Sequence, residues 1–323
     1  MTPQEMDKSI VRYGDLRPCK TAFIDAHTPG SDQKENFTVI GGGVSESADQ
    51  HVHITDTPGF NIGAAGQPPK CRNSLHVHRT AEVFFALKGR WRFFWGRWGN
   101  AGEVVLEEGD IINIPTGIFR GFENIGTDYG MIMAILGGDD AGGGVIWAPQ
   151  VIEDARDHGL MLGSNGKLYD SKKGASLPEG VGPMPLLTDE ELTQFPEPTT
   201  AEVVPGHVAR YWDLMALSDR QPARVIGAEG VLRDRPGFEV EFLSRNSIPD
   251  EFHAHERHCV LMPMRGHWRL RFEGGPETVL NPGDTALIQP GERHALAPSM
   301  TGEASLYRVI STEDPAGLTG RLL

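Results

Sequence analysis

Residues 76–82 read His76-Val-His78-Arg-Thr-Ala-Glu82, and residues 253–259 read His253-Ala-His255-Glu-Arg-His-Cys259. Each stretch has two histidines two positions apart and a third candidate metal ligand four residues after the second histidine. Alternate residues of a β-strand point to one face, so His76 and His78 are expected to face the same side, about 7 Å apart. Imidazole, thiolate and carboxylate groups are ligands of divalent metals. Both stretches are therefore candidate metal sites.

The segments that follow the two stretches share one pattern. Strands rich in β-branched and aromatic residues are predicted within residues 82–96, 103–117 and 129–136, and again within 259–272, 277–291 and 305–310. Turn residues separate them every 8 to 12 positions, which is typical of a barrel or sandwich. The two copies of the histidine stretch lie 177 residues apart, so a whole domain has been duplicated. The prediction is an all-β chain with two tandem barrels and a few short helices.

The predicted domains are 1–172 and 207–323, joined by a linker at 173–206 that carries six prolines. Strand-like pieces in the first 60 residues are expected to add outer strands to the first barrel. Helical spacing covers residues 150–162, and Thr188 with Glu191 forms a capping-box pattern.

Composition limits the classes of function. Apolar residues make up 39% and charged residues 23%, as in a soluble globular protein. The net charge of −14 disfavours nucleic acid and anionic membranes as partners. Three cysteines are too few for a disulfide framework, and neither an apolar signal core nor a stretch of 18 apolar residues is present. A cytoplasmic protein is expected.

A second segment in each repeat completes the candidate sites. It reads Gly109-Asp-x4-Pro115-Thr-Gly117-Ile-Phe-Arg120 in the first repeat and Gly283-Asp-x5-Pro290-Gly291-Glu-Arg-His294 in the second. When the two are aligned, His294 falls where Arg120 falls, and Cys259 falls where Glu82 falls. These paired motifs resemble those of the cupin family, G-x5-H-x-H-x3,4-E-x6-G followed by G-x5-P-x-G-x2-H. The chain looks like a bicupin, and the resemblance covers roughly residues 70–137 and 247–310.

The resemblance implies double-stranded β-helix (jelly-roll) barrels that each bind one divalent metal ion. Carried over by position, the ligands would be His76, His78 and Glu82 in the first barrel. They would be His253, His255 and His294 in the second barrel.

Both barrels depart from the family pattern. Arg120 replaces a ligand in the first, and a guanidinium cannot ligate a cation. We expect it to form a salt bridge with Glu82, which would close this barrel to metal; the alternative is that Arg120 receives an anionic substrate. Cys259 replaces the glutamate of the second barrel and leaves three neutral imidazoles, so the second barrel is the preferred metal site. Cys259 is either a buried structural residue or a site residue, since animal thiol dioxygenases also carry a Cys there.

Three-histidine sites resemble those of gentisate-type and other cupin dioxygenases, in which the metal is Fe(II). Three protein ligands leave open positions on such an ion. A non-haem Fe(II) dioxygenase acting on a small aromatic or organic acid is therefore favoured. An isomerase, lyase or decarboxylase that uses Mn, Ni or Zn stays open, as does a non-enzymatic binding protein. Arg257, Arg269, Arg271 and Arg293 lie near the second motif, and one of them could pair with a substrate carboxylate, although strand alternation does not indicate which of them points inward. The resemblance also implies a homodimer.

Overall fold

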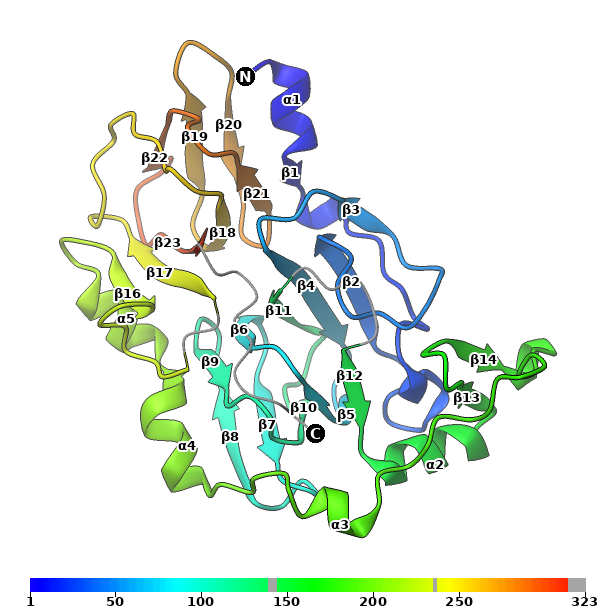
Figure 1. The fold of residues 1–323 in the computed structure, drawn as a ribbon. Helices are drawn as coiled ribbons and strands as arrows, with labels where there is room; N and C mark the ends of the chain where they lie inside the picture. The colour runs from blue at the N-terminus through cyan, green and yellow to red at the C-terminus, as the bar shows by residue number, and fades with distance from the viewer. Residues whose placement is uncertain (139–143, 235–236, 313–323) are drawn as a thin grey trace.

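The first barrel is built from two facing sheets. A computed structural model describes residues 1–138, 144–234 and 237–312 (Figure 1). One sheet has the strand order β15-β9-β6-β11-β4-β2-β3 and the other has the order β12-β5-β10-β7-β8. Their bounds are β2 Glu35–Ile40, β3 Val52–Ile54, β4 Phe60–Gln67, β5 Arg72–His78, β6 Glu82–Lys88, β7 Trp91–Trp95, β8 Gly102–Leu106, β9 Ile111–Ile114, β10 Arg120–Asn124, β11 Gly130–Gly137, β12 Val145–Trp147 and β15 Val208–Ala209. The predicted outer strands β2 and β3 do extend this barrel.

The second barrel repeats the arrangement with fewer strands. Its sheets have the orders β1-β21-β18-β23-β17-β16 and β20-β19-β22. Their bounds are β1 Ile10–Val11, β16 Ala223–Ile226, β17 Phe238–Ser244, β18 Cys259–Arg265, β19 Trp268–Phe272, β20 Glu277–Leu280, β21 Thr285–Ile288, β22 His294–Pro298 and β23 Ser305–Ser311. The predicted all-β fold with two barrels and a few short helices is confirmed.

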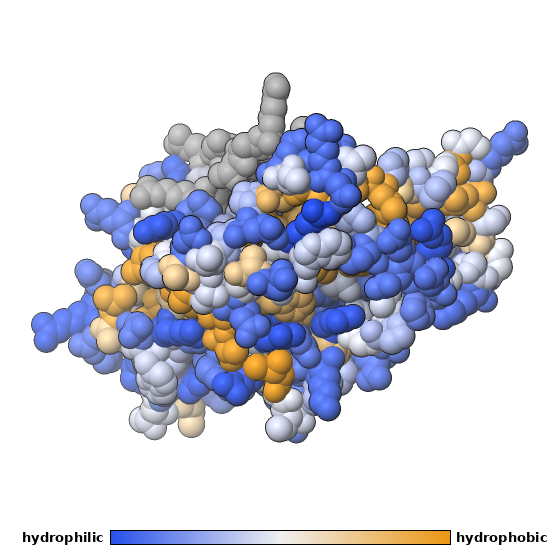
Figure 2. Space-filling view, turned by 90° about the horizontal axis from the view of Figure 1, so that it is seen from below, coloured by the Kyte–Doolittle hydropathy of each residue, from blue (hydrophilic) through white to orange (hydrophobic). Residues whose placement is uncertain are grey.

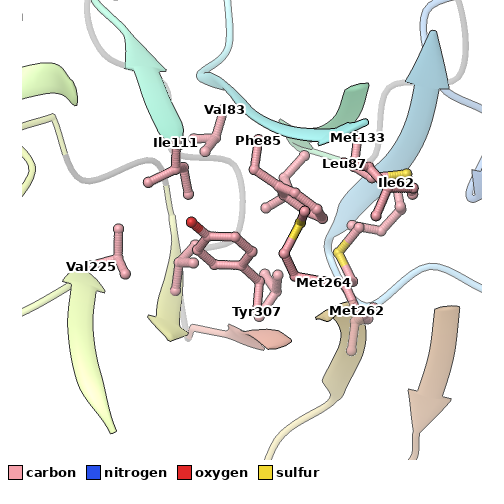
Figure 3. Close-up of a cluster of buried hydrophobic side chains, with 14 of the residues drawn as sticks. Ile62, Val83, Phe85, Leu87, Ile111, Met133, Val225, Met262, Met264 and Tyr307 are labelled. Carbon is pink, nitrogen blue, oxygen red and sulfur yellow. The ribbon is translucent and has the colours of Figure 1, made fainter. Parts of the chain in front are cut away.

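Strand alternation divides the side chains between two kinds of core. On β6, Phe84 points into the first barrel, whereas Val83 and Phe85 point outward into a cluster shared by both barrels. This shared cluster (Figure 3) includes Phe85 from the first barrel and Met262, Met264 and Tyr307 from the second. The Tyr307 hydroxyl also donates a hydrogen bond of 2.6 Å to the carbonyl oxygen of Gly109. The barrels therefore pack face to face across a continuous apolar interface.

Two short arms cross between the barrels. Strand β1, near the N-terminus, pairs with β21 of the second barrel, and β15 pairs with β9 of the first barrel. In Figure 1 the blue N-terminal segment lies beside the orange and brown strands of the second barrel. The expected division at residues 173 and 206 stays a prediction, and both arms cross it.

The helices are short, and one of them is shorter than predicted. They are α1 Pro3–Lys8, α2 Pro149–Asp157, α3 Asp189–Leu192, α4 Thr200–His207 and α5 Tyr211–Leu217. Helical structure was expected up to residue 162, but α2 ends before Gly159, whose φ of 88° is left-handed. Strand β13 (Leu160–Leu162) follows and pairs with β14 (Leu168–Asp170). The capping box of Thr188 with Glu191 is present at the start of α3.

The face of the molecule seen from below in Figure 2 is mostly hydrophilic. Figure 2 shows a face on which hydrophilic side chains surround smaller apolar groups. Within the described ranges, no helix combines the length and the apolar character that a membrane crossing needs.

Candidate metal centre

Three imidazoles converge in the second barrel. His253 lies outside the named strands and is tied to His294 of β22 by two backbone hydrogen bonds, of 2.9 and 2.8 Å. His255 follows two residues later on the same irregular segment. One ligand atom from each of the three histidines lies within 4.8 Å of the other two. In the second barrel, the isolated β-bridge between His253 and His294 thus takes the place of strand β5, which carries His76 and His78 in the first barrel.

Hydrogen bonds and burial prepare these imidazoles to bind a cation. The Nδ1 atoms of His253 and His294 lie 3.2 and 3.0 Å from the carbonyl oxygens of Glu251 and Glu292, so each Nδ1 carries the proton and each Nε2 keeps its lone pair. Burial lowers the pKa of His255 to about 3 and that of His294 to about 4. Both rings are therefore neutral near pH 7, as metal ligation requires.

Two unsatisfied atoms supply a test of whether a metal fits. The Nε2 atoms of His255 and His294 are buried and have no hydrogen-bond partner among the described residues. Buried polar atoms nearly always have a partner, so a missing partner needs an explanation. A divalent ion held between the three rings would satisfy both atoms. The residues present therefore fit such an ion.

Cys259 and His258 are not part of this group. Cys259 begins β18 and is fully buried beside apolar side chains, where burial raises the pKa of its thiol to about 12. A thiol with so high a pKa stays protonated and is a poor ligand. The His258 Nε2 atom contacts the Gln289 side chain at 3.1 Å.

The sequence interpretation missed a buried ion pair beside the histidines. Arg308 on β23 binds the Glu241 carboxylate on β17 through Nε at 2.8 Å and a terminal nitrogen at 2.6 Å. Both strands contribute to the interior of the second barrel. The Arg308 charge acts on His255 and His294 and helps to keep their pKa values low, after burial. A charged residue among the apolar residues of strand 305–310 was the available signal.

Three of the arginines expected near the substrate already have partners. Arg269 and Arg271 pair with Asp250, and Arg293 pairs with Glu273. These ion pairs are at least partly exposed to solvent. Arg308 is the more deeply buried arginine.

The first barrel brings His76, His78, Glu82 and Arg120 together, all buried. The Arg120 guanidinium binds the Glu82 carboxylate through Nε at 2.9 Å and through a second, closer contact. The salt bridge expected from the sequence is present. Burial is the largest single influence on Glu82 and raises its pKa, but the Arg120 charge together with His78 and His76 outweighs burial and holds that pKa well below its usual range.

This pair changes what the first cluster can bind. Ligand atoms of His76, His78 and Glu82 lie within 4.8 Å of one another, as a metal site needs. However, the carboxylate is already neutralised, and a cation placed there would face the guanidinium. Burial, and then the Arg120 charge, lower the pKa values of both histidines. As it stands, the arrangement does not fit a metal ion.

The strand pairing places the two clusters at equivalent positions. Arg120 pairs with His76 and Trp95, as His294 pairs with His253 and Phe272. Glu82 and Cys259 each begin the strand that pairs with the closing strand of their barrel. The alignment of motifs made from the sequence is therefore reproduced in three dimensions.

Comparisons with known proteins agree with this architecture. Residues 239–313 match the family described as an AraC-like ligand binding domain. No curated protein matches significantly. Among solved structures, an oxalate decarboxylase from Lactobacillus farciminis in complex with formate is 14% identical, with a TM-score of 0.56 over 95% of this chain and 86% of its own.

Two further structures belong to different functional classes. A salicylate 1,2-dioxygenase from Pseudaminobacter salicylatoxidans is 14% identical, with a TM-score of 0.53 over 94% of this chain and 83% of its own. A vicilin from Solanum melongena, described with anionic ligands in similar pockets, is 11% identical, with a TM-score of 0.52 over 96% and 86%. At such identities the likeness concerns the fold and not the reaction. The chain has the fold of a bicupin, with two tandem cupin barrels.

Proposed function

We propose that the second barrel binds one divalent metal ion through His253, His255 and His294, and that the protein is a non-haem Fe(II) dioxygenase. The observation that supports this most directly is the pair of buried, unpartnered Nε2 atoms of His255 and His294. Imidazole ligands suit Fe, Zn, Cu and Ni, whereas Mg, Ca and Mn favour oxygen ligands. Bound Fe(II) would supply the redox chemistry, and the barrel would hold and orient the substrate.

The proposed substrate is a small aromatic or organic acid. Arg308 is the buried arginine whose charge acts on His255 and His294. It is also paired, with Glu241, so a substrate carboxylate would have to share the guanidinium with that side chain. Bicupin structures described with salicylate dioxygenation or with formate make an acid a reasonable class. A homodimer is part of the same proposal.

Metal content and oxygen uptake test this function. Protein purified without a metal-affinity tag is expected to contain one metal ion per chain by elemental analysis. His294→Ala should lose most of it, while His76→Ala should lose little, because Arg120 already pairs with Glu82. With Fe(II) restored, the wild type should consume oxygen when offered aromatic or small organic acids. Equal metal loss from both variants would contradict the assignment to the second barrel.

The AraC-like match supports a second candidate, a barrel that binds a small molecule without converting it. Such a protein would bind the acid but consume no oxygen. Turnover without oxygen consumption would instead identify an isomerase, lyase or decarboxylase that uses Mn, Ni or Zn.

A further inference from the structure

A cavity lies inside the first barrel, next to the histidine cluster that does not fit a metal. Its walls come from both sheets of the barrel, and Phe23 and residues 43–45 also line it. Its free volume is about 70 Å³. A single buried water needs only about 10–15 Å³ of such volume, and a cavity of about 150 Å³ can take up benzene. The cavity is less than half as large as one that takes up benzene, so it suits a compact molecule of roughly three or four non-hydrogen atoms.

Small residues create this space. Gly63 and Ala65 of β4 and Ala134 of β11 all line the cavity. The strand register places Gly63 opposite Ala134, just as Glu241 lies opposite Arg308 in the second barrel.

By the same register Ala65 corresponds to Leu243. The second barrel thus fills with large side chains the positions that the first barrel leaves hollow. An empty apolar cavity lowers stability, because its lining loses packing contacts. A ligand in the first barrel would restore those contacts.

The walls favour an uncharged ligand. Most of the lining is apolar and includes Phe84 and Phe122. The only acidic side chain on the described wall, Glu82, is already paired with Arg120. An ionic ligand would have to leave water without finding a free counter-charge, which is costly.

Two polar atoms can orient such a ligand. Asn36 lines the cavity, and its Nδ2 is buried without a hydrogen-bond partner among the described residues, so it can donate. The His76 Nδ1 atom lies 2.7 Å from the carbonyl oxygen of Ser74, so Nδ1 carries the proton and Nε2 can accept. A carbonyl group would use the first atom, and a hydroxyl group could use both.

We infer that the first barrel is a binding site for a small, uncharged, mainly apolar molecule with one carbonyl or hydroxyl group. This site is separate from the proposed metal centre. The first barrel then does more than support the second: its arginine-glutamate pair removes metal binding, and its small residues make room for an organic ligand.

Ligand-observed NMR on the full chain tests this inference, with acetone as the probe and acetate as a charged probe of equal size. The wild type should bind acetone saturably and bind acetate at least tenfold more weakly. Ala65→Leu, which introduces the residue of the second barrel, should lower acetone affinity at least tenfold. Asn36→Ala keeps the space but loses the donor and should lower it several-fold.

The controls separate this site from the metal centre. Treating the wild type with a chelator should leave acetone binding unchanged, whatever the metal analysis shows. Circular dichroism establishes whether each variant is folded. If Ala65→Leu does not fold, the test rests on the Asn36→Ala variant. No saturable binding of acetone by the wild type, equal binding of acetate, or unchanged binding in a folded Ala65→Leu variant would each overturn the inference.

Discussion

At the scale of single residues, the position shared by Arg120 and His294 decides what each cluster can bind. His294 offers a lone pair to a metal, whereas Arg120 at the equivalent position offers a charge to Glu82. The sequence predicts the Arg120–Glu82 pair and the convergence of the three histidines, because motif spacing indicates the positions and the chemistry of each side chain decides what it can bind. It does not reveal the Arg308–Glu241 pair, since that pairing depends on the register of β17 against β23.

Removing Arg120 is expected to destabilise the fold. Arg120→Ala leaves the buried Glu82 carboxylate without its partner, which should cost about 3–5 kcal/mol of unfolding free energy. Denaturant unfolding measures this loss. The double variant Arg120→Met/Glu82→Leu should recover much of it, because neither charge then remains buried. Turnover per folded molecule should not change. A stable Arg120→Ala protein with weakened substrate binding would show that Arg120 is a binding residue.

Glu46 gives stability a pH dependence. Burial raises the pKa of its carboxyl from 4.5 to about 7, although Trp147 and the backbone of Ile24 donate hydrogen bonds to it. The charges nearby are Asp25, which raises this pKa, and Lys34, which lowers it. The folded state thus holds a proton that the unfolded state releases, so stability falls as the pH rises from 4.5 to 7.

The comparison with Glu46→Gln isolates this effect. Relative to the variant, the wild type should lose stability between pH 4.5 and 8, by at most about 3 kcal/mol. The residue's partial exposure reduces that figure. Unfolding free energies of both proteins across this range provide the measurement. A difference between them that is constant with pH would mean that Glu46 ionises normally.

At the scale of elements, the two arms repeat each other. Arg12 and the backbone of Tyr13 bind Asp284 of the second barrel, and Arg210 and the backbone of Tyr211 bind Asp110 of the first. The sequence carries this repeat as Arg-Tyr-x-Asp-Leu at residues 12–16 and 210–214. This repeat can be detected in the sequence. The pairing of each arm with the other barrel cannot, because a two-residue strand has no periodicity that could indicate its partner.

Removing either of the two aspartates that bind the arms should lower the free energy of unfolding by a similar amount. Asp284 and Asp110 are buried, and each accepts a charged and a backbone hydrogen bond from its arm. Asp284→Ala and Asp110→Ala should each cost about 2–3 kcal/mol, measured by denaturant unfolding. The exposed Asp7 supplies a matched control, since Asp7→Ala should cost little. A loss confined to Asp284→Ala or to Asp110→Ala would show that the arms are not equivalent.

At the scale of the whole molecule, duplication has left two barrels that share an apolar cluster but carry different side chains at their motif positions. The repeat in the sequence predicts two barrels, but it does not predict how they pack, because outward-facing apolar residues on strands look alike whatever covers them. In the structure, one apolar cluster spans both barrels, and the arms add crossed contacts. Neither barrel therefore keeps its full set of buried contacts when the other unfolds.

The chain should consequently unfold as one cooperative unit. Scanning calorimetry is expected to show a single transition, and metal should raise that transition as a whole. Binding to the folded state alone adds about 2.7 kcal/mol when the free metal is 100 times its dissociation constant. His294→Ala should unfold in one transition that metal no longer moves, because the three-histidine set is broken. Two resolved transitions, of which metal shifts only one, would mean that the barrels unfold independently and that the shared cluster couples them weakly.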